Sequence, residues 1–348
     1  MKQNRNISID ILKFFAVLLI TNSHFDEQYV YCKELATGGA IGDALFFFCS
    51  GYTLFLGRFG RFDEWYKRRI RRIYPSVLSL GLISVFLFQK DIGIGRLLSD
   101  GAGWFVMCIM IYYVALYFVR RYLVHNLRYV YVGVVLLILL WNSLFFEPIS
   151  SIFVENFKCL DWMIFCQPMD KVWIFQWNYF KFGFFFLYML IGADLGLRES
   201  KRKTQDSPKF LHTFLLLLLS IICFYAIPII CDLYPDTKYV LILSLIPLVY
   251  VVLYFYKLCQ TDFIRNLLNK KYIGSAVMII GGLCLEIYLV QPYLRTTDLN
   301  HLFPLNIVIL SVAIVFVGYV CRSLGRFIQQ TFSSEEGYEW KSIFRLIR

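Results

Sequence analysis

The stretch DILKFFAVLLITNSHF, residues 10–25, is an apolar segment that carries Lys13 near its start and His24 near its end. Such a run is typical of a helix that crosses a lipid bilayer. A charged side chain at membrane depth is costly, so it is usually retained because it has a partner or a function. The step from Lys13 to His24 amounts to about three turns plus 20°, which places both on one helix face about 16 Å apart. Asp10 lies on nearly the same stripe.

The whole chain has the composition of a membrane protein. Its 348 residues are 59% hydrophobic and only 17% charged, and the mean hydropathy is +0.61. A soluble domain of this length carries more surface charge. The net charge of +11 does not indicate nucleic-acid binding, because the basic residues fall between apolar runs. The ten cysteines form no CxxC pair and predict neither a disulfide framework nor a metal site.

Ten apolar runs are long enough to span a bilayer. They lie near residues 8–25, 40–57, 74–89, 103–119, 129–146, 177–197, 211–231, 239–256, 273–294 and 304–321. With the amino terminus in the cytoplasm, 26 of the 35 basic residues fall on the inner side and 7 on the outer side. Cytoplasmic loops carry such an excess. We therefore predict an all-α integral membrane protein with about ten transmembrane helices and cytoplasmic amino and carboxyl termini.

The predicted spans form one domain. Residues 1–330 are expected to make a single transmembrane domain, and residues 331–348 a short cytoplasmic tail at the inner surface. The outer stretch 147–176 is the longest loop and is rich in aromatic residues. It suits an interfacial or re-entrant element, or a lid that stacks on a sugar.

His24 is the histidine that shares a helix stripe with other ionisable residues. Imidazole takes up a proton near pH 7, which suits a general base acting on a hydroxyl. The alternative is a polar residue that caps the outer end of the first span. This helix alone leaves both interpretations open.

The stretch WYKRRIRRIYPSV, residues 65–77, holds Arg68, Arg69, Arg71 and Arg72 just before the third apolar run. Membrane orientation by itself attracts basic residues to a cytoplasmic loop. Arg69 and Arg72 lie one turn apart, however, and guanidinium groups bind phosphate in a bidentate way. The cluster therefore predicts a cytoplasmic phosphate ligand, either a nucleotide-like cofactor or an anionic lipid headgroup.

Glu286 lies well inside the ninth apolar run, where a carboxylate needs a partner. Lys13 or His24 would serve. Three further polar or aromatic residues lie in apolar runs: Asp43, Ser50 and Trp104. The sequence has no GxxxxGK[ST] motif for ATP hydrolysis and no cluster with zinc-ligand spacing.

Four blocks, taken in order, resemble the acyltransferase-3 family of integral-membrane O-acyltransferases that modify surface glycans. The blocks are Lys13 with His24, FFFCSGY at 46–52, Arg69 with Arg72, Ile73 and Pro75, and LEIYL at 285–289, which contains Glu286 and Tyr288. The resemblance covers roughly residues 5–325.

Two positions depart from the family pattern. Many relatives carry an acidic residue where this chain has Ala44, one step after Asp43, which leaves the role of Asp43 open. Many also carry histidine where this chain has Gln291. The second departure argues against essential proton transfer at position 291.

The resemblance implies an acyl-CoA donor, usually acetyl-CoA, bound from the cytoplasm, and an acceptor hydroxyl on a glycan, often lipid-linked. Arg69 and Arg72, with Arg68, would hold the CoA phosphates, and Lys13 would organise the inner pocket. His24 would act as base or carry the acyl group transiently, with Glu286 as the next candidate base. The remaining expected binding residues are Asp10, Asp43, Ser50, Trp104 and Tyr288.

The resemblance also implies a location and a set of partners. We expect a multi-pass protein of the cytoplasmic (inner) membrane of a bacterium, with the lipid bilayer and a glycan as partners. Neither a metal nor a nucleic acid is expected.

The main alternative is a proton-coupled transporter or flippase of a lipid-linked or small anionic substrate. Buried Lys, His and Glu residues suit proton coupling. A second alternative is a non-catalytic scaffold for glycan assembly. It would not explain why Lys13, His24 and Glu286 lie within apolar runs. Binding or hydrolysis of acetyl-CoA distinguishes the enzyme from both alternatives.

Overall fold

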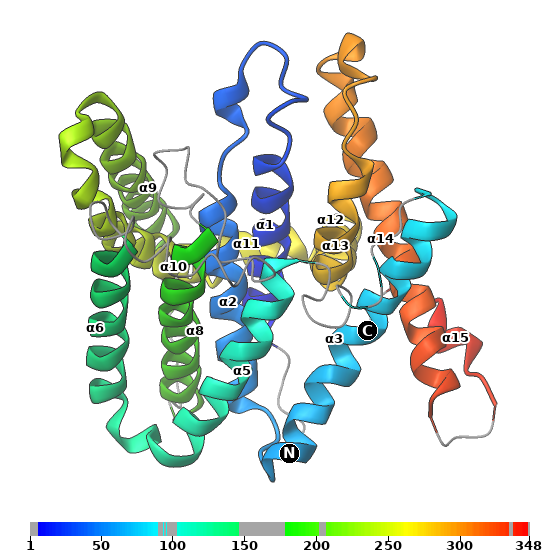
Figure 1. Cartoon of the computed structure of the whole chain (residues 1–348), viewed down its shortest axis with the longest axis horizontal. Helices are drawn as coiled ribbons and strands as arrows, with labels where there is room; N and C mark the ends of the chain where they lie inside the picture. The colour runs from blue at the N-terminus through cyan, green and yellow to red at the C-terminus, as the bar shows by residue number, and fades with distance from the viewer. Residues whose placement is uncertain are drawn as a thin grey trace. The chain divides into compact units, whose positions relative to one another are not determined.

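The computed structural model in Figure 1 describes residues 6–89, 93, 95, 103–145, 178–201, 207–333 and 337–346. Every regular element in these residues is a helix, which confirms the predicted all-α class. Five of the helices are long and apolar enough to cross a membrane, or six if a bent pair counts as one span. Ten spans with cytoplasmic termini stay a prediction. The aromatic loop at 147–176 lies outside the described residues.

The helices group into two compact units, of which the first comprises Met1–Phe46, Arg58–Tyr113 and Asn266–Arg348. Its helices are α1 (Ile7–Ser23), the first part of α2 (Gly39–Leu56), α3 (Phe62–Phe86), the first part of α5 (Trp104–Tyr122), α12 (Lys271–Gly282), α13 (Cys284–Leu294), α14 (Leu305–Thr331) and α15 (Trp340–Ile343).

The second unit comprises Phe47–Gly57 and Val114–Arg265. It contains the rest of α2 and α5, then α6 (Leu127–Phe145), α8 (Asn178–Lys201), α9 (Phe210–Leu233), the 3₁₀ helix η5 (Pro235–Ser244), α10 (Leu245–Cys259) and the start of α11 (Asp262–Leu268). The predicted span at 239–256 therefore begins as a 3₁₀ helix and becomes α-helical at Leu245.

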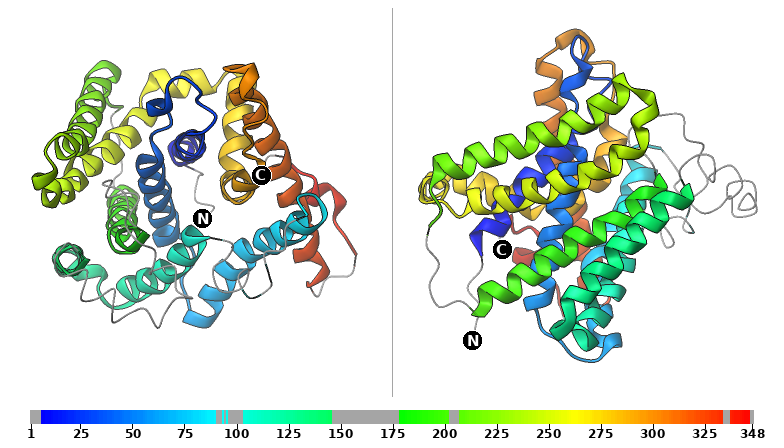
Figure 2. Two further views of the ribbon diagram at one scale, coloured as in Figure 1. Left: turned by 45° about the horizontal axis from the view of Figure 1, so that its top comes forward. Right: turned by 90° about the vertical axis from the view of Figure 1, so that its left-hand side faces the viewer.

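Close helix contacts in the first unit depend on glycines. A Cβ atom at Gly281 of α12 would lie 2.8 Å from the carbonyl oxygen of Asp10, so α1 packs directly on the α12 backbone. A Cβ at Gly325 of α14 would lie 3.2 Å from the carbonyl of Pro75, which brings α14 against α3. Small residues allow such approaches in membrane helices. The left view in Figure 2 shows α3 and α14 side by side.

Two sequence predictions need correction. The apolar runs at 40–57 and 74–89 predict a loop between them, but α3 begins at Phe62 and carries all four clustered arginines. The predicted span at 273–294 is broken, because α12 and α13 meet at 73°. Gly281 and Gly282 have poor helix propensity, and the Leu283 N–H bonds the carbonyls of Ile279 and Ile280 to close α12.

The described part of the predicted tail folds back on α14. The rings of Phe327 and Tyr338 stack with centroids 5.0 Å apart, and the Tyr319 hydroxyl donates to the Phe344 carbonyl over 2.9 Å. The tail thus packs against a helix that also carries site residues.

Candidate functional site

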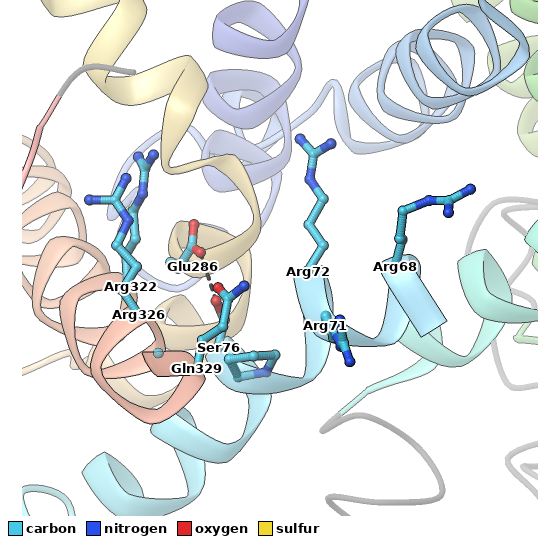
Figure 3. A pocket seen from close by; sticks show the side chains of 10 residues that line it. Arg68, Arg71, Arg72, Ser76, Glu286, Arg322, Arg326 and Gln329 are labelled. Carbon is cyan, nitrogen blue, oxygen red and sulfur yellow. Dashed lines mark hydrogen bonds between the residues drawn. The ribbon is translucent and has the colours of Figure 1, made fainter. Parts of the chain in front are cut away.

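A cavity of about 320 Å³ lies between α3, α13 and α14 in the first unit (Figure 3). Its lining consists of Arg68, Arg71, Arg72, Pro75, Ser76, Glu286, Arg322, Gly325, Arg326 and Gln329. Five guanidinium groups and one carboxylate give it a strong net positive charge. Such a cavity suits an anion that carries several negative charges.

Helix periodicity explains how the arginines converge. On α3, Arg68, Arg72 and Ser76 recur every four residues and share one stripe. On α14, Arg322 and Arg326 do the same. Gly325 lets the two stripes approach each other, so the cavity is formed by the packing of α14 on α3.

The cavity arginines differ in their partners. Arg326 donates from Nη1 to the carbonyls of Ser342, Ile343 and Arg345 at 3.0, 3.1 and 2.6 Å, so the tail holds this side chain. Arg322 is only 8% exposed, yet its Nη1 is buried without a hydrogen-bond partner in the described part of the chain. A buried cation without a counter-ion is costly. An anion in the cavity would relieve that cost.

Glu286 belongs to this cavity, where the Ser76 hydroxyl donates to its Oε1 over 2.7 Å and both residues are buried. The sequence suggested Lys13 or His24 as the partner, and this proves wrong. His24 instead meets Gln291, five residues further along α13. Five helical steps turn the side chain by about 140° and move it about 7.5 Å along the axis. Glu286 and Gln291 therefore face different surroundings.

His24 lies one residue beyond the end of α1, at its C-cap. Its Nδ1 is 2.8 Å from Nε2 of Gln291, which is 1% exposed. The Arg295 side chain donates to the His24 carbonyl over 3.0 Å. His24 thus occupies the capping position and also contacts a buried polar group, while its role as a general base stays a prediction.

Lys13 is half-buried on α1 and makes no hydrogen bond or ion pair with any described residue, including the buried Asp10. Helix α1 packs on α12 and α13. Cys284, at the start of α13, interacts electrostatically with Lys13, Glu286 and Arg72. Lys13 therefore lies within electrostatic range of the start of α13, although it does not line the arginine cavity.

Three other predicted residues come together away from the arginines. Buried Asp43 on α2 interacts electrostatically with Tyr288 of α13. The Tyr288 ring lies 4.9 Å from that of Phe105, which contacts the Trp104 ring edge-on at 5.8 Å. These groups form a second, mainly aromatic cluster within the first unit.

Besides Asp10, Lys13 and His24 on or next to α1, two more predicted residues lie outside both groups. Arg69 is absent from the cavity lining, and its guanidinium stacks over Trp65 at 4.8 Å. Ser50 belongs to the second unit, where its carbonyl accepts a hydrogen bond from Thr53.

Comparison with known proteins decides the family. The acyltransferase-3 family, described as an acyltransferase domain, matches residues 6–323, nearly the whole chain. The chain belongs to this family. No curated protein and no solved structure matches it. Together with its apolar helices, membership indicates a multi-pass membrane acyltransferase.

Within this acyltransferase-3 domain, sequence reasoning missed several groups that line the cavity. They are Arg322, Arg326, Ser76 and Gln329. Gln291 stood out in the sequence only as a departure from the family pattern, and its contact with His24 was not predicted. In the sequence, Arg322 and Arg326 stand out only as part of the excess of basic residues on the inner side. Their four-residue spacing on an otherwise apolar helix was the available signal. Among the described residues, no group of three or more His, Cys, Asp or Glu could hold a metal ion.

Proposed function

We propose that this protein transfers an acyl group, with acetyl as the favoured group, from acyl-CoA to a hydroxyl of a cell-surface or lipid-linked glycan. The observation that carries the proposal is the arginine cavity with its buried Arg322, whose Nη1 has no hydrogen-bond partner among the described residues. CoA bears a diphosphate and a separate phosphate, so it matches a site with several guanidinium groups. Family membership supplies the acyl-transfer chemistry.

Helix α13 connects the donor site to the proposed base. Glu286 lines the arginine cavity, and Gln291 contacts His24 about 7.5 Å further along the same helix. The flexible pantetheine arm of acyl-CoA can cover that distance and bring the thioester toward His24. Lys13 lies beside the start of this path and would help to organise it.

His24 takes the role of general base in this scheme. It removes the proton from the acceptor hydroxyl as the oxygen attacks the thioester carbonyl, and the proton is then passed to the departing thiolate of CoA. A transient acyl-His24 intermediate is the covalent version of the same reaction. The arginines hold the donor and take no part in proton transfer.

We place the arginine cavity in the cytoplasmic half of the inner membrane of a bacterium. The support is the excess of Lys and Arg between alternate apolar runs, which also favours ten spans with both termini cytoplasmic. The donor is then bound from the cytoplasm, and the acceptor lies toward the outer face.

A proton-coupled transporter or flippase is the second candidate. The observation in its favour is the broken span of α12 and α13, because transporters often build substrate sites from discontinuous helices. A transporter would neither hydrolyse acetyl-CoA nor transfer its acetyl group.

The deciding experiment uses membranes that contain the protein and acetyl-CoA labelled in the acetyl group. Label is followed into lipid-linked and polymeric glycan for the wild type, His24→Ala and the control His301→Ala. His301 is an exposed histidine outside the site. We expect transfer by the wild type and the control, and none by His24→Ala.

Two results would count against the proposal. Full transfer by His24→Ala would remove His24 from the chemistry. A wild-type protein that neither binds nor hydrolyses acetyl-CoA would favour the transporter.

A further inference from the structure

The contact between His24 and Gln291 determines which ring nitrogen can act. We infer that Gln291 is a positioning residue that sets the tautomer of His24: its amide oxygen accepts a hydrogen bond from Nδ1–H, and Nε2 is left as the proton acceptor. This inference rests on the proposed role of His24 as base, and its test is independent of acyl transfer.

The geometry places the Gln291 amide against Nδ1 at 2.8 Å, with Gln291 only 1% exposed. In the structure the amide nitrogen faces the ring, and Oε1 is buried without a partner among the described residues. A half-turn of the amide exchanges its two ends, which have nearly the same size. In either orientation the Gln291 amide forms a hydrogen bond with Nδ1. Its nitrogen donates to Nδ1, or its oxygen accepts from Nδ1–H.

The two amide orientations leave the same number of amide groups without a partner, so the reaction decides between them. If the amide nitrogen donates to Nδ1, the neutral ring carries its proton on Nε2 and cannot take another there. If the amide oxygen accepts from Nδ1–H, the lone pair lies on Nε2, directed away from Gln291. Only the second arrangement leaves the nitrogen on the far side of the ring basic.

Other contacts hold the ring in place for this role. His24 lies at the C-cap of α1, and the Arg295 guanidinium donates to its carbonyl over 3.0 Å. The charged Arg295 thus holds the His24 backbone, and the neutral Gln291 forms a hydrogen bond with the His24 ring. Glutamine cannot transfer protons, but a residue that sets the tautomer needs only a hydrogen-bond acceptor.

The direct test is ¹⁵N NMR of the purified protein labelled at histidine, because the two ring nitrogens of each neutral tautomer have well-separated shifts. His24→Gln identifies the His24 signals by difference. His301 provides an internal reference, since its Nδ1 lies 2.8 Å from the backbone carbonyl oxygen of Asp298 and must donate to it. We expect His24 to show the same Nδ1–H pattern as His301.

Two variants separate the ring contact from general packing. Gln291→Met has a similar volume but no acceptor, so the His24 signals should leave the Nδ1–H pattern, whereas Gln291→Glu should preserve it. The matched control is Gln28→Met. Gln28 is also 1% exposed, and it donates to the Thr296 carbonyl rather than to the His24 ring. This control should leave the His24 signals unchanged.

In the transfer assay, Gln291→Met should lower kcat by at least about tenfold with little change in KM for acyl-CoA. An Nε2–H pattern for His24 in the wild type would overturn the inference, as would an unchanged tautomer in Gln291→Met. If the wild type shows the expected tautomer but transfers no acetyl group, the proposed function fails while the tautomer assignment stands.

Discussion

Glu199 in the second unit and Arg322 in the first are charged side chains with opposite surroundings. Glu199 of α8 accepts two hydrogen bonds at Oε2, from Tyr52 at 2.8 Å and Tyr256 at 2.5 Å, and one at Oε1 from Gln260 at 3.2 Å. Arg322 has a buried nitrogen with no acceptor among the described residues. The fold satisfies the first charge, whereas the second is the group that we propose binds an anion.

The difference teaches how to separate structural from functional charges in an apolar protein. The donors to Glu199 come from α2, α10 and the residue after α10, so this carboxylate joins helices within its unit. A charge that already has its partners stabilises the fold. A buried charge that lacks them lowers stability until a ligand arrives, and so marks a binding site.

The largest expected effect on stability is that of Glu199→Leu. Removing the carboxylate leaves two buried tyrosine hydroxyls and one glutamine amide without their acceptor. Each unsatisfied group costs about 1 kcal/mol or more, so we expect a loss of about 3 kcal/mol. Thermal unfolding in detergent measures it. The acyl-CoA Kd of the folded variant should not change, and a stability equal to that of the wild type would disprove the structural role.

Arg322→Met should produce the opposite pattern. The variant keeps most of the side-chain volume and loses the unpartnered buried charge, so the ligand-free protein should melt at a higher temperature. Losing a charge-assisted hydrogen bond to phosphate, worth about 1.5–3 kcal/mol, should weaken acyl-CoA binding by about 10- to 100-fold. Titration calorimetry and a melting curve give both numbers. A lower melting temperature without ligand would contradict the comparison.

A smaller effect is expected when Arg72→Gln is compared with Arg69→Gln. Arg72 lines the cavity but is exposed, so water screens it and its loss should raise the Kd for acyl-CoA by about threefold to tenfold. Arg69 stacks on Trp65 outside the lining, so its replacement should leave that Kd unchanged and lower stability slightly. Equal effects of the two variants on Kd would show that the cavity does not define the binding site.

Much of the helical architecture could be predicted because apolar length and periodicity act locally. Lys13, His24 and the α3 arginines were recognisable as charges within or beside apolar runs. The hydrogen-bond partners of these residues could not be predicted, because they depend on contacts between segments that are distant in the sequence. Ser76 meets Glu286 across 210 residues, and His24 meets Gln291 across 267. Arg322 and Arg326 look like ordinary orientation charges until Gly325 brings α14 against Pro75.

The two corrected predictions about helix boundaries have the same origin. Basic residues before an apolar run suggest a loop, yet nothing in residues 62–74 prevents a helix, and α3 continues through them. The Gly281–Gly282 pair indicates a break in the helix, but the hydropathy of the segment stays high across the pair and gives no sign of it. Local polarity reports membrane depth better than it reports where a helix begins or bends.

The smallest predicted effect tests Glu199, the charged residue whose hydrogen-bond partners all come from the fold. Tyr52→Phe removes one hydroxyl and leaves Glu199 Oε2 with the Tyr256 hydroxyl as donor, so the carboxylate is never stripped of all its partners. We expect a loss of about 1 kcal/mol, seen as a modest fall in melting temperature. Tyr256→Phe is the matched variant. Combining the two should cost more than the sum of the single changes, because only the double variant leaves Oε2 without a hydroxyl donor. Simple additivity would mean that Glu199 is satisfied by water and that the three helices are joined by packing alone.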